Sequence, residues 1–276
     1  MGAVALILAV LVGTTGLYVF FVEPLWVLPL LERMTPNILY RVQTKKGLVA
    51  LSFDDGPHPR FTPQVLEILE QYGAKATFFL IGERVLNYPE IVARIRAAGH
   101  EVGNHYWENG PTLEHSDAKF VEKLQATERA LENAKAKTGR ASHEENPGSQ
   151  YEPGAPASGY TVYTVKAASS RRTPKVVRFF RPPGGVAWPW QLRLTRERGY
   201  TCVLGCAYPH DPMRPPVKYI RWLIEKNLAS GTIVVLHDGI KDATRSIAAL
   251  PHILEEGKRR GLSFVSIGTI VLEADQ

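Results

Sequence analysis

Apolar and polar positions alternate along most of the chain in a way that separates strands from helices. From residue 47 onward, short runs rich in β-branched and aromatic residues, such as "GLVALSF" and "KATFFLIG", alternate with longer stretches such as "TPQVLEILEQYG". The longer stretches place apolar residues at helical spacing, whereas the short runs suit buried strands. Regular alternation of strand and helix indicates an α/β fold with a parallel sheet.

The number of these units narrows the fold class. The alternation covers residues 47–272 and yields about seven strands and about six helices. No GxGxxG or Walker-type loop follows a predicted strand, which disfavours an open nucleotide-binding sheet. We therefore expect one distorted (β/α) barrel of about seven or eight strands, closed or partly closed.

One segment inside the predicted barrel shows neither strand nor helix periodicity. Residues 141–175 are rich in Pro, Gly, Ser and Ala. We expect a disordered insertion that serves as a spacer. A lid that faces the substrate is the alternative interpretation.

The amino-terminal residues form a separate apolar segment. "MGAVALILAVLVGTTGLYVFFV", residues 1–22, contains no charged side chain, and as a helix it would span about 33 Å, enough to cross a bilayer. We expect a single-pass transmembrane helix that anchors an extracytoplasmic domain, with residues 23–46 as a juxtamembrane linker. A cleaved signal peptide and a buried helix are the alternatives. The "PLWVLPLL" run with Trp26 suits either the membrane interface or packing on the domain.

Composition and charge add two exclusions. The 276 residues are 45% hydrophobic and 22% charged, and the net charge of +6 comes from basic residues scattered along the chain. Because no aromatic residues are interleaved with a basic patch, we expect no nucleic-acid partner. Cys202 and Cys206 lie in a predicted strand, where a separation of about 13 Å excludes a disulfide between them.

Polar residues follow four of the predicted strands directly. They are Asp54 and Asp55, His105 with Asn109, Arg181, and His237 with Asp238. Because the carboxyl ends of barrel strands share one mouth, we expect these side chains to converge. A carboxylate and an imidazole suit a first-row divalent ion such as zinc, and a second carboxylate can act as a general base beside it. A cation and an arginine would also offset the repulsion between the adjacent aspartates.

The sequences around these residues resemble motifs of the polysaccharide deacetylases with a NodB homology domain, carbohydrate esterase family 4. The resemblance covers nearly all of the predicted barrel except the insertion. "SFDDGP" is similar to the first motif, which implies that Asp54 is the general base and Asp55 a metal ligand. "GHEVGNHYWEN" is similar to the second motif, which has two histidine ligands. His105 matches the first of them, Asn109 stands in the place of the second, and His115 is an alternative ligand.

Two further motifs imply the remaining catalytic groups. "RFFRPPGG" resembles the third motif, which implies that Arg181 orients the base and that the Gly184 amide binds the oxyanion. "VVLHDG" resembles the fifth motif, which implies that His237 is the general acid and that Leu236 lines the acetyl pocket.

The fourth motif departs from the family pattern. In "GYTCVLGCAYPHDP", Tyr208 stands where the family has an aspartate that tunes the acid histidine, and Pro212 stands where it has a tryptophan that lines the pocket. We place Tyr208 among the substrate-binding residues. Asp211, close by in the sequence, is the alternative partner for the histidine.

The resemblance implies metal-dependent hydrolysis of an N-acetyl, or alternatively an O-acetyl, group on an acetylated glycan such as chitin or peptidoglycan. Zinc is the expected cofactor, with cobalt or another first-row ion as alternatives. Trp107, Trp188 and Trp190 are candidates for stacking on sugars, and core packing explains them equally well. The alternative function is a membrane-anchored, catalytically degenerate protein that binds glycan without turnover. Hydrolysis of a non-polymeric amide is a third possibility.

Overall fold

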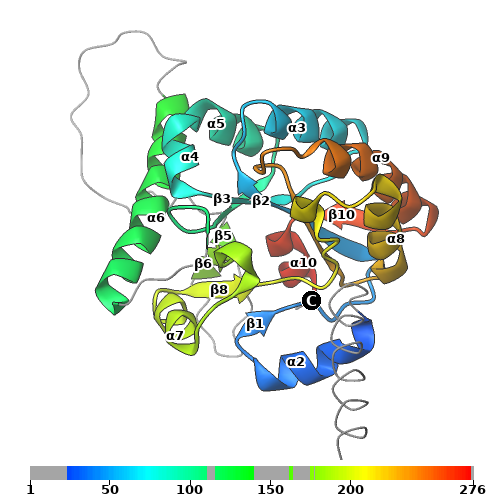
Figure 1. Cartoon of the computed structure of the whole chain (residues 1–276), viewed down its shortest axis with the longest axis horizontal. Helices are drawn as coiled ribbons and strands as arrows, with labels where there is room; N and C mark the ends of the chain where they lie inside the picture. The colour runs from blue at the N-terminus through cyan, green and yellow to red at the C-terminus, as the bar shows by residue number, and fades with distance from the viewer. Residues whose placement is uncertain (1–23, 111–115, 140–161, 164–174, 177, 275–276) are drawn as a thin grey trace, which may run out of the picture.

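Strands and helices alternate along the chain as the apolar pattern predicts (Figure 1). The computed structural model describes residues 24–110, 116–139, 162–163, 175–176 and 178–274. The strands are β1 (Ile38–Leu39), β2 (Leu48–Gly56), β3 (Thr77–Leu80), β4 (Glu101–Asn104), β5 (Val162–Tyr163), β6 (Lys175–Val176), β7 (Arg178–Phe180), β8 (Tyr200–Val203), β9 (Ile233–His237) and β10 (Ser263–Val265). The α-helices are α2 (Leu28–Met34), α3 (Phe61–Gln71), α4 (Gly82–Asn87), α5 (Pro89–Ala97), α6 (Asp117–Gly139), α7 (Pro189–Glu197), α8 (Val217–Asn227), α9 (Thr244–Arg259) and α10 (Ile267–Ala274). Short 3-10 helices are η1 (Leu25–Val27), η2 (Pro183–Gly185) and η3 (Asp211–Met213).

An eight-stranded sheet forms the centre of the domain. Its strand order is β1-β8-β7-β4-β3-β2-β10, and β9 pairs with β2. The paired strands run parallel. Single bridges, Ala207 with Val234 and Arg41 with Thr232, connect β9 to the segments that follow β8 and β1. The predicted parallel (β/α) fold is thus confirmed, and it takes the form of a curled partial barrel.

Helices cover the outside of the curled sheet. In Figure 1, α3, α5 and α9 lie together along one side, with α8 beside α9 and α6 at the far edge. The main core forms between these helices and the strands, where Leu51, Phe78 and Leu236 pack with Leu69 and Ile253. Because both faces of parallel strands are covered, these strands consist of nearly continuous apolar runs in the sequence.

Residues 24–46, which we expected to form a linker, are part of the domain. Strand β1 pairs with β8, with Ile38 opposite Cys202. Helix α2 packs Leu28 against Tyr40 and Cys206. The pairing joins segments far apart in the chain, so the local sequence carried no signal for it. Both cysteines are buried and form no disulfide with each other, as the sequence predicts.

Two expectations fall mainly outside the described residues. The transmembrane helix expected at residues 1–22 lies entirely outside them, and no helix within the described ranges has the length and apolar character needed to cross a bilayer. The insertion expected at 141–175 also lies largely outside. Its described residues contribute to a short antiparallel pair, in which Val162 of β5 lies opposite Val176 of β6.

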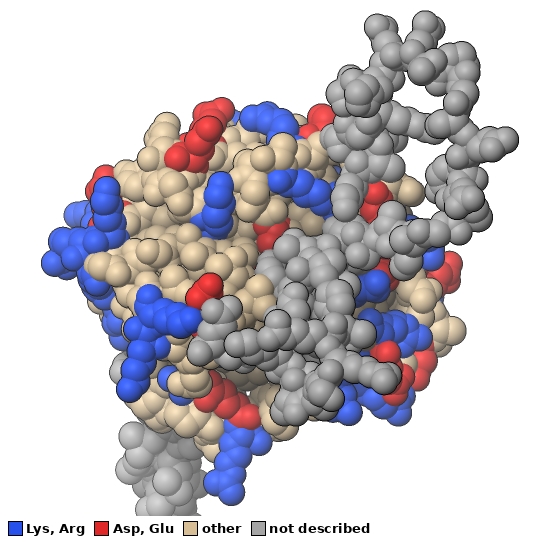
Figure 2. Space-filling model, turned by 180° about the vertical axis from the view of Figure 1, so that it is seen from behind, with Lys and Arg blue, Asp and Glu red and all other residues tan. Residues whose placement is uncertain are grey.

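Charged side chains of both signs share the surface. On the face seen in Figure 2, Lys and Arg lie among Asp, Glu and uncharged residues. Ion pairs such as Arg221 with Glu225 and Arg260 with Glu256 neutralise part of the positive charge locally. Mixed charge of this kind does not create the strong single-sign field that draws a polyanion to a protein.

Candidate active site

The carboxyl ends of four strands meet at one cavity of about 350 Å³. Asp54, His105, Arg181 and His237, all expected at strand ends, line this cavity. The register of the sheet explains the convergence. Asp54 on β2 is the direct partner of His237 on β9, and β4 and β7 are paired one residue before His105 and Arg181. The strands therefore bring these four side chains to the same end of the barrel.

Asp54 and Arg181 form a buried ion pair. Arg181 Nη1 lies 2.6 Å from Asp54 Oδ1 and donates to Ser52 Oγ at 2.8 Å. Its Nε donates to the Val203 carbonyl at 3.0 Å, and the guanidinium lies 4.1 Å from the centre of the Phe79 ring. Both charged side chains are almost fully buried, so each offsets the desolvation cost of the other. The arginine thereby fixes the position of the Asp54 carboxylate at the cavity.

Asp55 and His105 form a second pair. Because a carbonyl oxygen only accepts, His105 Nδ1 must carry the proton that it donates to the Arg181 carbonyl at 2.8 Å. His105 Nε2 lies 3.3 Å from Asp55 Oδ1. Burial raises the pKa of Asp55, but the hydrogen bond and charge interaction with His105, with the charges of His237 and Arg84, lower it to about 2. In the neutral tautomer, the lone pair of Nε2 and the carboxylate both face a position that suits a cation.

The Asp55–His105 pair therefore fits two ligands of a divalent ion. Metal-binding histidines commonly donate their second ring N–H to a backbone carbonyl, as His105 does here. Imidazole and carboxylate together suit first-row divalent metals. Among the described residues, no group of three or more His, Cys, Asp and Glu side chains is close enough to hold a metal.

The predicted third ligand, Asn109, is exposed in the loop after β4. Like Asp55, it does not line the cavity, so its role as a metal ligand stays a prediction. The alternative ligand, His115, lies outside the described residues.

The backbone of Asp55 is held in an unusual conformation. Its φ is 67°, a left-handed value that is uncommon for a residue other than glycine. Arg84 Nη1 donates to the Asp55 carbonyl at 2.6 Å and also to the Gly239 carbonyl. A Cβ atom at Gly239 would lie 1.9 Å from the Asp55 carbonyl oxygen. Any side chain at position 239 would collide with the Asp55 backbone, so this position requires glycine.

His237 is held by Asp211 rather than by Tyr208. His237 Nδ1 lies 2.9 Å from Asp211 Oδ1, and its backbone N–H donates to Asp211 Oδ2 at 2.9 Å. Ser246 Oγ donates to the same Oδ2 at 2.6 Å. Burial by itself lowers the pKa of His237, but the charge and hydrogen bond of Asp211, with the charges of Asp54 and Asp55, raise it to about 9. Because Nδ1 is engaged, Nε2 is the ring nitrogen available for proton transfer.

Four other residues of the third, fourth and fifth motifs occupy different positions. Gly184 and Tyr208 line the cavity as expected, and the Tyr208 ring centre lies 5.6 Å from that of His237. Leu236 does not line it, because its side chain is fully buried in the core under the helices. Val235 lines the cavity instead. The expectation for Leu236 was wrong, since successive side chains of a strand point to opposite faces and His237 takes the cavity face. Pro212 is exposed and does not line the cavity.

Asp238, which follows His237 in the sequence, is buried outside the cavity. It is fully buried and accepts a hydrogen bond from Thr62 Oγ1. Burial raises its pKa to about 7, and the charges of Asp55 and Asp54 act in the same direction. It does not line the cavity. Its position next to β2 and α3 indicates a structural role.

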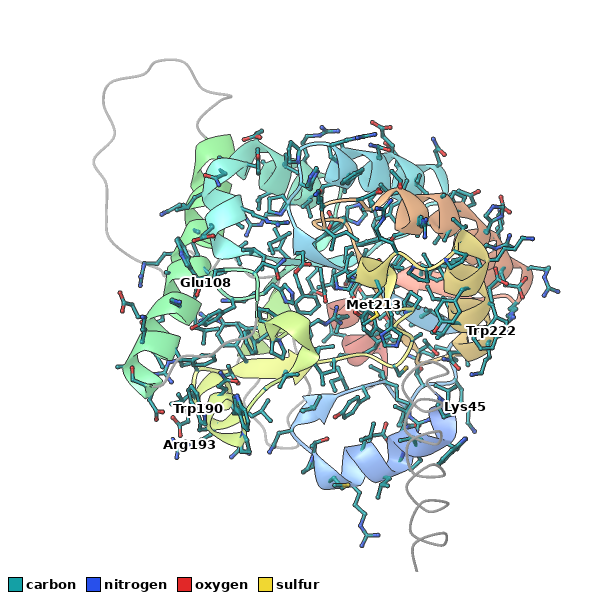
Figure 3. The ribbon with its side chains drawn as sticks, viewed as in Figure 1. Lys45, Glu108, Trp190, Arg193, Met213 and Trp222 are labelled. Carbon is teal, nitrogen blue, oxygen red and sulfur yellow. The ribbon has the colours of Figure 1, made fainter. Side chains whose placement is uncertain are left out.

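The three candidate tryptophans are used in different ways. Trp107 packs partly buried against the main core. Trp190 lies on α7 near Arg193 (Figure 3) and packs against Phe120, with ring centres 5.3 Å apart. Trp188 is 54% exposed, so it alone of the three is available for contact with a sugar.

Sequence analysis missed several residues that build the site. The alternation of side chains along β9 indicates that Val235 faces the cavity together with His237. Arg84 and Ser246 had no such signal, because they come from α4 and α9 and reach the site only through tertiary packing.

Comparisons with known proteins agree with this geometry. Residues 41–153 match the family model for polysaccharide deacetylase. A peptidoglycan-N-acetylglucosamine deacetylase of Bacillus cereus is 34% identical over 239 residues, which cover 86% of this chain and 94% of the relative. A chitooligosaccharide deacetylase of Bradyrhizobium sp. is 30% identical and covers 77% of this chain and 85% of its own length.

A solved structure shows the same fold. The crystal structure of the Bc1960 peptidoglycan N-acetylglucosamine deacetylase, in complex with 4-naphthalen-1-yl-N-oxidanyl-benzamide, superposes with a TM-score of 0.67 at 25% identity. The match covers 85% of this chain and 92% of that one. The cavity, the buried aspartate pairs that surround it and these relatives agree with one another. The chain belongs to the polysaccharide deacetylase family of hydrolases.

Proposed function

We propose that this protein hydrolyses the N-acetyl groups of an N-acetylglucosamine-containing glycan, of the peptidoglycan or chitooligosaccharide type. The observation that carries the proposal is the pairing of Asp54 with His237 across β2 and β9. It places a carboxylate held by Arg181 and an imidazole held by Asp211 on the same cavity. A base and an acid that face one cavity are what amide hydrolysis requires. The names of the relatives supply the glycan class.

The side chains divide the reaction between them. Asp54 accepts a proton from the attacking water, while Arg181 keeps the carboxylate in position. As the water oxygen bonds to the acyl carbon, the Gly184 N–H at the cavity edge donates to the developing oxyanion. Protonated His237 donates from Nε2 to the sugar nitrogen, and the C–N bond breaks. The products are acetate and a free amino sugar.

We assign the Asp55–His105 pair as the protein ligands of a divalent metal, with zinc as the first candidate. Such an ion would supply a Lewis acid that polarises the acyl oxygen and acidifies the attacking water. The tautomer of His105 supports this role, because its Nδ1–H is used by the Arg181 carbonyl and its Nε2 faces Asp55. The third ligand is either Asn109 after a loop movement or His115.

A second function competes with the first because of this third ligand. Within the described residues, no group of three or more His, Cys, Asp and Glu side chains could hold a metal ion. A protein that bound glycan but held metal too weakly for turnover would show the same geometry. The acid and base pairs favour the enzyme, since a binding protein has no need of a buried Asp54–Arg181 pair beside a raised-pKa histidine.

We also propose that residues 1–22 anchor the domain to a membrane, with the domain on the extracytoplasmic side. Their uncharged sequence supports this, as does the surface of the segment that follows. Trp26 and Met34 are 68% and 70% exposed on η1 and α2, and a tryptophan at this distance from an apolar span suits the membrane interface.

Acetate release tests the proposal directly. Full-length protein in detergent is incubated with N-acetylglucosamine oligomers, peptidoglycan and acetylated xylan, with added zinc or cobalt and with a chelator. We expect metal-dependent acetate from the N-acetylated glycans, and none from the Asp54→Asn variant. The naphthyl-bearing N-oxidanyl-benzamide of the structural relative serves as a competing ligand. If metal and glycan bind but acetate never appears, the binding protein is the correct assignment.

A further inference from the structure

The catalytic cavity continues into an apolar space that the catalytic residues do not fill. One side of this space is formed by the amino-terminal segment, through Val27, Leu28, Leu31 and Tyr40. We refer to these four residues as the α2 wall. Leu204, Cys206 and Val235, from the segment after β8 and from β9, also line this space, and Leu28 and Tyr40 pack directly against Cys206.

Helix α2 presents different side chains to the cavity and to the outside. Leu28 is 6% exposed and Leu31 is half-buried, and both line the cavity. Leu30 on the same helix is 59% exposed and does not line it. The α2 wall is therefore a built surface, and the helix offers a matched leucine on its outer face.

The polar groups of the α2 wall are used within the segment itself. The Tyr40 hydroxyl is bonded to Thr35 Oγ1 at 2.9 Å. Thr35 Oγ1 also donates to the Leu31 carbonyl at 2.7 Å. A sugar hydroxyl placed against this wall would leave water without gaining these groups as partners, which is unfavourable. The space thus suits a part of the substrate that carries no hydroxyl groups.

The acyl group is the part of an N-acyl amino sugar that has this property. Val235 lies two residues before His237 on the same face of β9, about 7 Å deeper along the strand. The apolar space therefore begins below the group that protonates the sugar nitrogen, while the hydroxylated ring can remain at the polar end. The whole cavity measures about 350 Å³, its polar end included, which is within the range of sites for whole small molecules.

We infer that the α2 wall and Val235 form a subsite for an acyl chain longer than acetyl, so that the substrate class includes N-acyl amino sugars with an apolar acyl group. The inference rests on the proposed hydrolysis of an amide at Asp54 and His237. Each methylene buried in such a subsite can improve kcat/KM by up to about fourfold until the space is full.

The test compares one glucosamine oligomer carrying N-acetyl, N-butyryl or N-hexanoyl groups. Release of the free amine is measured, since this product is the same for all three. For full-length protein we expect kcat/KM for butyryl to equal or exceed that for acetyl. Leu31→Trp, which fills the space, should lower the hexanoyl-to-acetyl ratio at least tenfold. Leu30→Trp, the matched change on the outer face, should leave the ratio unchanged. Val27→Phe replaces Leu31→Trp if the latter does not fold, as judged by its thermal midpoint.

The outcomes separate the subsite from the proposed function. If no amine is released from any substrate, the proposed hydrolysis is wrong and the subsite falls with it. If acetyl is removed but butyryl is cleaved about a hundredfold more slowly, the function stands and the subsite is wrong. A ratio that Leu31→Trp does not change also overturns the assignment. An N-acetylated oligomer with an octyl aglycone is the last arm. A gain from the octyl group that Leu31→Trp abolishes would place the apolar group on the sugar side and overturn the acyl assignment.

Discussion

Asp211 contacts His237 twice, through the ring nitrogen Nδ1 and through the backbone N–H, each at 2.9 Å. A single carboxylate thus fixes both the position of the strand end and the tautomer of the ring. Ser246 supports the same carboxylate from α9. Asp211 lies three residues after Tyr208, the position at which the sequence resemblance led us to expect this aspartate.

Replacing Asp211 should move the alkaline limit of activity. In the metal-free protein the pKa of His237 is raised from 6.5 to about 9, and a bound cation that neutralises Asp54 and Asp55 would leave it between these values. Asp211→Asn removes the largest raising contribution, and a return to 6.5 would reduce kcat/KM by up to about thirtyfold at pH 8. The measurement is kcat/KM against pH. Asp242→Asn, the same chemical change at a carboxylate paired with Arg214, is the control. An unchanged limit in Asp211→Asn would remove His237 as the acid.

The same shift predicts a pH dependence of stability. Because the folded-state pKa lies above the ordinary value of 6.5, protonated His237 stabilises the fold fully below about pH 6.5, and this contribution is lost as the pH rises through about 9. We expect the thermal midpoint of the metal-free wild type to fall over that range, and the midpoint of Asp211→Asn to fall less. A bound cation should reduce the effect, since it neutralises the charges of Asp54 and Asp55 that help raise the pKa.

The adjacent aspartates should separate in their effects on metal and on turnover. Asp55→Ala removes the carboxylate beside His105 Nε2, so we expect loss of both bound metal and activity. Asp54→Asn should keep the metal and lose turnover by about 100-fold to 10,000-fold, because an amide cannot accept a proton from water. Metal content by mass spectrometry and acetate release on the same samples check both changes. Near-normal turnover in Asp54→Asn would contradict the assignment of the base.

The third metal ligand can be assigned by two alanine variants. Asn109 is exposed and away from the cavity, so Asn109→Ala should lower metal affinity by less than about threefold if the loop stays in place. His115→Ala tests the alternative. If His115 is the third ligand, this change should lower metal affinity at least about tenfold. Zinc affinity is measured by competition with a chromogenic chelator. A large loss in Asn109→Ala with none in His115→Ala would show that the loop closes over the ion and brings Asn109 to it.

Membrane association should depend on residues 1–22. Their uncharged sequence predicts that full-length protein stays in the membrane fraction after carbonate extraction. Met34→Ser, which keeps Trp26 as the fluorescent probe, should leave this anchoring intact but weaken the contact of the domain with the bilayer, because the Met34 side chain is exposed. Quenching of tryptophan fluorescence by brominated lipids in nanodiscs reports that contact. Complete recovery of full-length protein in the soluble fraction would rule out the anchor.

The sequence by itself determined the parallel (β/α) architecture and four of the residues that line the candidate active site. Both followed from local pattern, because buried parallel strands are continuous apolar runs and polar residues directly after such runs must lie at the same end of the sheet. Asp54, His105, Arg181 and His237 met on one cavity for that reason. The sequence could also have predicted the position of Val235. Successive side chains of a strand point to opposite faces, so Val235 shares a face of β9 with His237, and Leu236 points to the core.

Only the tertiary structure decided the groups that hold these residues and shape the substrate space. Asp211, Ser246 and Arg84 reach the site from loops and helices whose approach depends on packing rather than on any repeat in the sequence. Residues 24–46 contain a strand and form one wall of the cavity because β1 pairs with β8, which is distant from it in the chain. Contacts between segments that are distant in the chain leave no local signature, because their free energy appears only when the whole core has formed.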